Sequence, residues 1–353
     1  MTLEDIAEQL VNRQLEQPVT VIVIVAAITL ALIPGILQLT VKPSTEAILP
    51  EDDPAVQSLD TLRTKFNGDT TYIVFESQDV RNQQLLTNLD RVGNRLDDHE
   101  DIAGTRSPAS VALRQHSRIP GEAELEQLEY GSLVSTDYST GVMAVQADTQ
   151  ARAPSIRSVH DHITRVMDSE LPNTAYQLTG YNMIDLATFQ VIMNDFATIT
   201  VFSFAAVLTT LYLVFRTVKK MLLPLAPVIL ALIWMLGIGG YFGVNLTIIS
   251  MVSAAMIMGL GIDFGIHVTK HYYNTEGGPD HLRKTMRELT RGLLGGALTT
   301  SVGFLSLLFA ALAGMHGLGI FLFTGILSAY VGAVVLLPTI ITLTEPSLNG
   351  GTQ

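Results

Sequence analysis

The 353-residue chain contains no cysteine, so neither disulfides nor thiolate metal sites can contribute to its stability or chemistry. It is also poor in charge, because 15% of its residues are charged, against roughly a quarter in typical soluble domains. Hydrophobic residues make up 48% of the chain, and the mean hydropathy is positive. This composition excludes an ordinary soluble protein and indicates an integral membrane protein.

Sequence motifs for nucleotide chemistry and hydrolysis are also missing. We find no Walker A sequence, no dinucleotide-binding glycine motif and no hydrolase elbow, which argues against ATP-driven transport by this chain. His116, His160 and His162 lack a metal-ligand arrangement, so we predict no metal site, no cofactor and no catalytic residues. The acidic balance of the segment that contains these histidines gives no footprint for nucleic acid.

Six hydrophobic segments are long enough to cross a bilayer. We predict an amphipathic helix or, as the alternative, a frayed tail at residues 1–17, and a first span at 18–39. The other five spans lie within 194–343, before a C-terminal tail at 344–353. Lys and Arg concentrate in the link between spans two and three and in the link at 270–291. By the positive-inside rule, these links and both termini are cytoplasmic in a multi-pass protein of the cell membrane.

Residues 40–193 differ from the rest of the chain, since they are acidic and contain no long apolar run. Their pattern predicts a separate extracytoplasmic α+β domain with the order βαββαβ of a ferredoxin-like split unit. The Glu-rich segment 107–130 does not fit this order and is expected to be an inserted hairpin or lid. We expect strands at 71–76, 133–136, 142–147 and 175–178, a further strand near 102–106, and helices at 83–96 and 154–170.

The fourth span, residues 248–269, carries Asp263 and His267 one helical turn apart. Ionisable groups are costly in hydrocarbon, and those found there usually face a bundle interior and serve a pathway or relay. On a helix, Gly261 and Gly265 lie on a different face, made mostly of small residues, where a neighbouring helix can approach closely. Asp263 is therefore the leading functional residue, and His267 either extends its relay or caps the polar edge of the span.

Hydroxyl groups in the fifth span are candidate partners of Asp263. Thr299, Thr300 and Ser301 could donate hydrogen bonds to its carboxyl group, either as part of a relay or as permanent partners. Hydroxyls in membrane helices also often bond to their own backbone. Thr300 shares a helical face with Gly296 and Gly303, which we predict to be packing positions.

Three motifs resemble those of the resistance-nodulation-division (RND) superfamily, particularly the mycobacterial-type large membrane proteins (MMPL) and the hopanoid exporters. They are Gly259-Leu260-Gly261-Ile262-Asp263-Phe264-Gly265-Ile266-His267, Gly296-Ala297-Leu298-Thr299-Thr300-Ser301-Val302-Gly303-Phe304 and Leu49-Pro50-Glu51-Asp52-Asp53-Pro54. The resemblance implies a secondary transporter, not an enzyme, that exports lipids or other hydrophobic molecules. It also implies an external porter domain and proton uptake and release at Asp263.

Members of this superfamily are usually about twice as long, with two such halves related as parallel repeats. The resemblance therefore implies either a homo-oligomer, with a dimer favoured, or a missing second half. Drug-efflux relatives pair adjacent acids of the fourth span with a lysine, whereas Asp263 is followed by Phe264 and no span contains Lys or Arg. The partner of Asp263 is then Asp263 of a second subunit or a group from the missing half.

Two other functions are compatible with six spans and an external domain. The span region is similar to sterol-sensing domains, whose fourth span can carry a Gly-rich, acid-containing motif, which would indicate a lipid-sensing or regulatory module. A third hypothesis is that the chain is a subunit resembling the Sec translocon accessory proteins. The fourth span lacks the motif expected of that group.

Overall fold

The computed structural model of the chain describes residues 3–42, 45–50, 52–66, 69–116, 118–120, 124, 130–149, 153–274 and 279–344. Two compact units are formed by the chain. The membrane unit consists of Met1–Val41 and Ile192–Gln353, and the sheet unit consists of Lys42–Val191.

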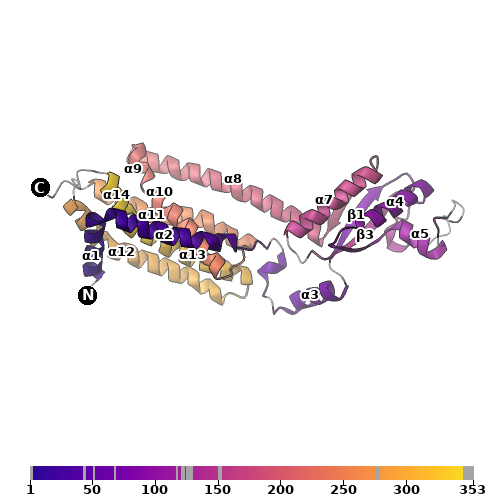
Figure 1. Cartoon of the computed structure of the whole chain (residues 1–353), viewed down its shortest axis with the longest axis horizontal. Coiled ribbons are helices and arrows are strands. Elements are labelled where there is room, and N and C mark those ends of the chain that lie inside the picture. The colour runs from indigo at the N-terminus through magenta and orange to yellow at the C-terminus, as the bar shows by residue number, and fades with distance from the viewer. Residues whose placement is uncertain are drawn as a thin grey trace. The chain divides into compact units, whose positions relative to one another are not determined.

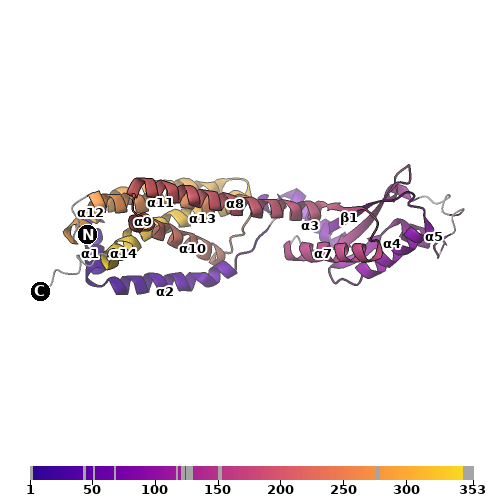
Figure 2. The same cartoon turned by 90° about the horizontal axis from the view of Figure 1, so that it is seen from above.

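Six helical segments of the described chain are long and apolar enough to cross a membrane, which confirms the predicted number of spans. They are α2 (Pro18–Leu37), α8 (Tyr181–Phe215), α9 with α10 (Val218–Leu222, Leu225–Tyr241), α11 (Ile248–Asn274), α12 with η3 (Pro279–Leu305, Ser306–Phe309), and α13, η4 and α14 (Ala313–Val331, Gly332–Leu336, Leu337–Thr344). Within the membrane unit, α13 packs against α10, α11 and α12, and α2 packs against α10 (Figures 1 and 2).

The contact between α2 and α10 depends on a close approach of the two backbones. A Cβ atom added at Gly237 would lie 2.6 Å from the carbonyl oxygen of Leu32, so only glycine fits there without movement. Beside this contact, Trp234 Nε1 donates a hydrogen bond of 2.9 Å to Thr29 Oγ1. Small residues and interhelical hydrogen bonds are the usual means of helix association in lipid.

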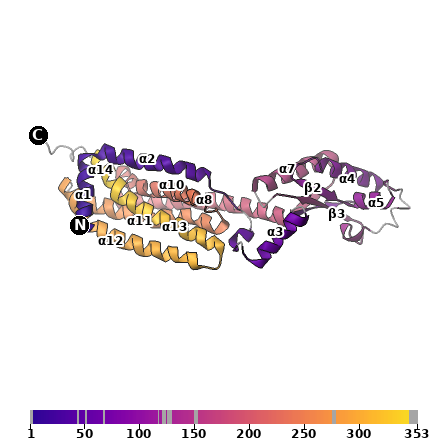
Figure 3. The same cartoon turned by 60° about the horizontal axis from the view of Figure 1, so that its bottom comes forward.

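A short helix, α1 (Leu3–Glu16), packs against α12 and α14 (Figure 3). Pro338 has no N–H, so it cannot donate to the carbonyl of Val334 one helical turn earlier, and the last span forms a π-helical turn at η4. The side chain of Gln14 from α1 is fully buried and donates through Nε2 to that carbonyl at 2.9 Å. This side of α1 therefore lies against protein, and Gln14 donates to a carbonyl to which the proline cannot donate.

A double-mutant cycle tests this role of Gln14. Gln14→Met keeps the side-chain volume but leaves the Val334 carbonyl unpaired, which should cost about 1–3 kcal/mol. In a Pro338→Ala background the restored amide can bond that carbonyl, so the same substitution should cost much less. The measurement is denaturant unfolding of the four proteins in detergent micelles. Equal costs in both backgrounds would show that Gln14 contributes through packing alone.

The sheet unit is built on four strands, β1 (Asp69–Glu76), β2 (Ile102–Arg106), β3 (Thr140–Ala147) and β4 (Tyr176–Gly180). Their order in the sheet is β2-β3-β1-β4, and every neighbouring pair is antiparallel. The remaining elements of the unit are η1 (Thr45–Ile48), α3 (Pro54–Phe66), α4 (Gln83–Leu96), α5 (Pro108–His116), η2 (Gly131–Leu133) and α7 (Ala153–Glu170).

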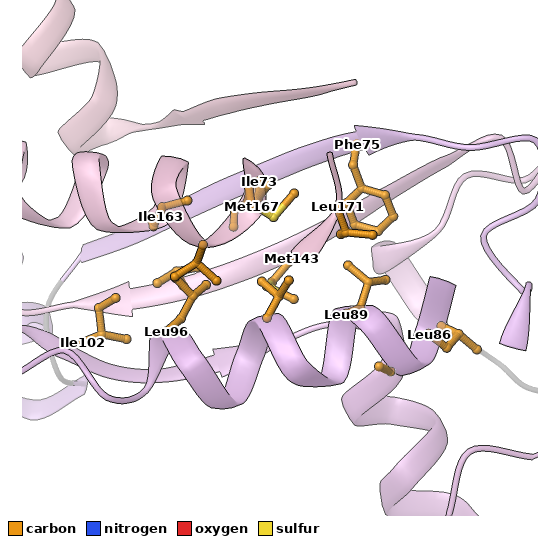
Figure 4. Packing of buried hydrophobic residues seen from close by; sticks show 14 of the residues in the cluster. Ile73, Phe75, Leu86, Leu89, Leu96, Ile102, Met143, Ile163, Met167 and Leu171 are labelled. Carbon is orange, nitrogen blue, oxygen red and sulfur yellow. The ribbon is translucent and has the colours of Figure 1, made fainter. Parts of the chain in front are cut away.

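Alternation along the strands creates the core of the sheet unit. In β1 and β3, side chains such as Ile73, Phe75 and Met143 are fully buried, and they point toward Leu89 of α4 and Ile163 of α7 (Figure 4). Successive side chains of a strand face opposite sides, so one face of the sheet packs on the helices. The periodicity-based predictions of the first strand and of both helices are confirmed.

Three local features differ from the sequence-based expectations. Residues 133–136 do not form a strand, because η2 ends there and only an isolated bridge joins Val134 to Gly141. The segment 107–130, expected to be an inserted hairpin or lid, begins with the helix α5; residues 117, 121–123 and 125–129 lie outside the described chain. Helix α3 was not predicted, although Asp53 accepts a hydrogen bond of 2.8 Å from the Ala55 amide at its start.

Candidate functional site

Asp263 lies on an uncovered side of α11. Gly259, Leu260, Asp263 and His267 are all exposed, and their spacing places them on one side of the helix. Neither Asp263 nor His267 forms a hydrogen bond or an ion pair with any residue that the structure describes. The carboxyl and imidazole groups are therefore presented outward from the chain.

The opposite side of α11 is held by close helix contacts. A Cβ atom added at Gly265 would lie 2.8 Å from Pro224 Cα, at the start of α10. One added at Gly261 would lie 3.1 Å from the Cβ of Ala329 in α13. These contacts fix the rotation of α11, and they thereby fix the direction in which Asp263 points.

Thr299 and Thr300 lie on exposed parts of α12, which packs against α11, whereas Ser301 is buried. The hydroxyl of Thr299 donates to carbonyls of its own helix, at 2.9 Å to Gly295 and 3.0 Å to Gly296. Thr300 has no hydrogen-bond partner in the described part of the chain. Neither hydroxyl is bonded to Asp263 in a single copy of the chain.

Gly296 and Gly303 also differ from the glycines of α11. A Cβ atom added at either position would meet no described atom within 4 Å. They therefore make no close helix contact within the described chain, and their packing role stays a prediction.

Phe264 occupies the position of the second acid found in drug-efflux relatives. Its ring is partly buried and meets Tyr330 of α13 edge-on, with ring centroids 6.3 Å apart and an interplanar angle of 83°. An edge-to-face pair of this kind is a packing contact. Phe264 thus binds α11 to α13, while the preceding Asp263 points outward.

A partly buried ion-pair group in the sheet unit was missed by sequence reasoning. Arg63 of α3 contacts Glu46 at 2.6 Å and Asp69 of β1 at 2.9 Å. Burial lowers the pKa of Arg63, but its hydrogen bond to Glu46 and the two negative charges outweigh that effect and raise it. Burial raises the pKa of Asp69, although Arg63 opposes this. The three residues lie in three different elements, η1, α3 and β1, so periodicity within one element could not have joined them.

Comparison with known proteins assigns this chain to a family. The model of the MMPL family matches residues 47–348, a range that includes most of both units. The chain belongs to the MMPL family. The resemblance predicted from the three motifs is thereby confirmed, and Asp263 lies inside the MMPL match.

Two relatives show how much of such proteins this MMPL chain represents. It is 25% identical over 373 residues to a protein of Methanocaldococcus jannaschii that is named as a membrane protein, with 98% of this chain and 95% of the relative covered. It is 25% identical over 247 residues to the probable transport protein MmpL12 of Mycobacterium tuberculosis, with 66% of this chain covered. That match spans only 21% of MmpL12.

A matched pair of glycine substitutions tests the two kinds of surface in this MMPL chain. Gly265→Ala should lower the free energy of unfolding by about 1–3 kcal/mol, because the new methyl group would overlap the backbone at Pro224. In the detergent-solubilised monomer, Gly296→Ala should not lower it, and should raise it by up to about 1 kcal/mol through helix propensity. Helical circular dichroism during denaturation in detergent would measure both. Equal destabilisation at the two positions would contradict the assignment of these faces.

Proposed function

We propose that the protein is a secondary transporter that moves lipids or other hydrophobic molecules outward, driven by protons through Asp263. The observation that carries this proposal is an ionisable carboxyl group on a membrane-spanning helix, exposed and without a partner in the described chain. Membership of the MMPL family and the printed name of MmpL12 as a probable transport protein support the same function.

The uncovered face suggests where the site is completed. A charged group facing hydrocarbon is costly, and such groups almost always face a bundle interior or a water-filled cavity. Around Asp263, a Cβ atom at Gly259 would meet nothing within 4 Å, as at Gly296 and Gly303. These small residues would let another helix approach closely. We infer that a second copy covers this face in a homodimer, and that a missing second half would serve the same purpose.

The proposed relay uses the change of charge at Asp263. When water reaches the carboxyl group it can release a proton, and when the face closes against the partner the protonated group carries no charge into the low-dielectric seam. His267 lies one turn further along the same exposed side, and it would extend the relay toward the basic link. Thr300 would donate to Asp263 of the other copy, whereas Thr299 already bonds to its own backbone.

We further propose that the sheet unit is an extracytoplasmic porter domain that passes the substrate. Its strand order β2-β3-β1-β4, with α4 and α7 packed on the core face, supports a ferredoxin-like fold. The Lys and Arg residues of the link at 270–291 support a cytoplasmic position for that link and, with it, for the termini.

Replacement of Asp263 tests the transport mechanism. In vesicles that contain the reconstituted protein and an imposed pH gradient, Asp263→Asn should reduce proton-dependent movement of a fluorescent phospholipid to the level of empty vesicles. Its unfolding profile should stay unchanged, because Asp263 forms no hydrogen bond or ion pair with a described residue. Asp195→Asn, at an exposed acid of α8, is the matched control and should transport normally.

Two outcomes would decide against the proposal. Undiminished proton-dependent flux through the Asp263→Asn variant would rule out the relay. Lipid binding without flux by the parent protein would favour the sterol-sensing-like module or an accessory subunit over a transporter.

A further inference from the structure

The first turns of α12 carry a face of basic side chains directly before the apolar part of its span. Lys284, Arg287 and Arg291 are exposed and recur at helical spacing, so they lie on one side of the helix. Together with Glu288 they line a surface hollow of about 470 Å³. The hollow thus has three cationic residues and one acidic residue around it.

The other side of this segment is fixed in the protein. Leu282, Met286 and Leu293 are buried in one cluster with Val11 of α1 and Tyr272 of α11. Because α12 continues as one helix into its span, this packing sets the rotation of the basic face. The cationic groups are therefore held outward at the end of the apolar segment, where phospholipid headgroups lie.

The acid in the hollow has a partner of its own. Glu288 Oε2 lies 3.3 Å from His271 Nε2, and His271 Nδ1 lies 3.0 Å from Thr285 Oγ1, so this carboxylate contacts the end of α11. Lys284 and Arg291 form no hydrogen bond or ion pair with another described residue. Lys284 and Arg291, which lie at the two ends of the basic face, are therefore available to bind a ligand.

The positive charge of this face contrasts with the negative charge of the whole chain, whose formal net charge is -12. Clusters of Lys and Arg beside a membrane span attract anionic lipids, since each cation near the surface adds favourable electrostatic energy. We propose that Lys284, Arg287 and Arg291 form a binding site for the phosphate headgroup of an anionic phospholipid. This inference requires only a membrane location and does not depend on transport through Asp263.

Native mass spectrometry of the full chain in detergent, with added phosphatidylglycerol or phosphatidylcholine, tests the site. The parent protein should bind phosphatidylglycerol in preference to phosphatidylcholine, and this preference should fall at high salt. Lys284→Gln with Arg291→Gln should weaken phosphatidylglycerol binding about tenfold or more. Phosphatidylcholine binding should not change.

Two further proteins separate the site from general charge and folding effects. Arg91→Gln with Arg157→Gln removes the same charge from exposed positions of the sheet unit, and it should bind lipid as the parent does. Lys284→Arg with Arg291→Lys keeps both charges in place and should retain phosphatidylglycerol.

The outcomes that overturn the proposal are distinct. They are equal binding of the two lipids by the parent, a preference that salt does not weaken, and phosphatidylglycerol binding by the double glutamine variant that matches the parent. Displacement of phosphatidylglycerol by an equal concentration of inorganic phosphate would assign the site to a soluble anion and would also overturn it. If the glutamine variant fails to fold, the salt dependence of the parent still decides the result.

Discussion

A carboxyl group that faces outward from a membrane-spanning helix needs a partner, because hydrocarbon does not solvate charge. The chain provides Asp263 with a fixed direction but with no partner among its described residues. Gly261 and Gly265 allow α11 to pack closely on the neighbouring spans, and this packing turns Asp263 away from them. The oligomeric arrangement, the relay and the glycine-lined surface that we propose all follow from this one unmet requirement.

Several other polar groups of the membrane unit form hydrogen bonds within the chain. Gln14 donates to the Val334 carbonyl, to which Pro338 cannot donate, and Trp234 donates to the hydroxyl of Thr29 across a helix contact. Thr299 bonds to its own backbone. Unlike these groups, the exposed residues Asp263 and His267 have no partner among the described residues. Their ionisable groups are therefore available to a second molecule, to water or to a proton.

The sequence predicts features that depend on local periodicity. Six apolar segments, the first strand of the sheet and the helices at 83–96 and 154–170 follow from hydropathy and spacing alone. Periodicity also places Asp263 and His267 on a common side of a helix. It cannot tell which side of that helix meets the rest of the chain, because that depends on the neighbouring spans.

Features that depend on distant partners could not be predicted. The contact of Gln14 with Val334 joins opposite ends of the sequence, and the ion pairs of Arg63 join three separate segments. The bond of Thr299 to its own helix could not be predicted either, because the sequence alone is equally compatible with a bond to Asp263. Residues 133–136 have the pattern of a strand, yet they pair only through one isolated bridge, so tertiary context overrides propensity there.

Cysteine cross-linking tests most directly whether a second copy covers the face of Asp263, because the chain has no native cysteine. Leu260→Cys places a thiol on the exposed side of α11 beside Asp263, and Phe202→Cys places one on an exposed position of α8. After mild oxidation in membranes, the account predicts a covalent dimer from Leu260→Cys and none from Phe202→Cys. A Leu260→Cys protein that stays monomeric, or equal cross-linking at both positions, would contradict it.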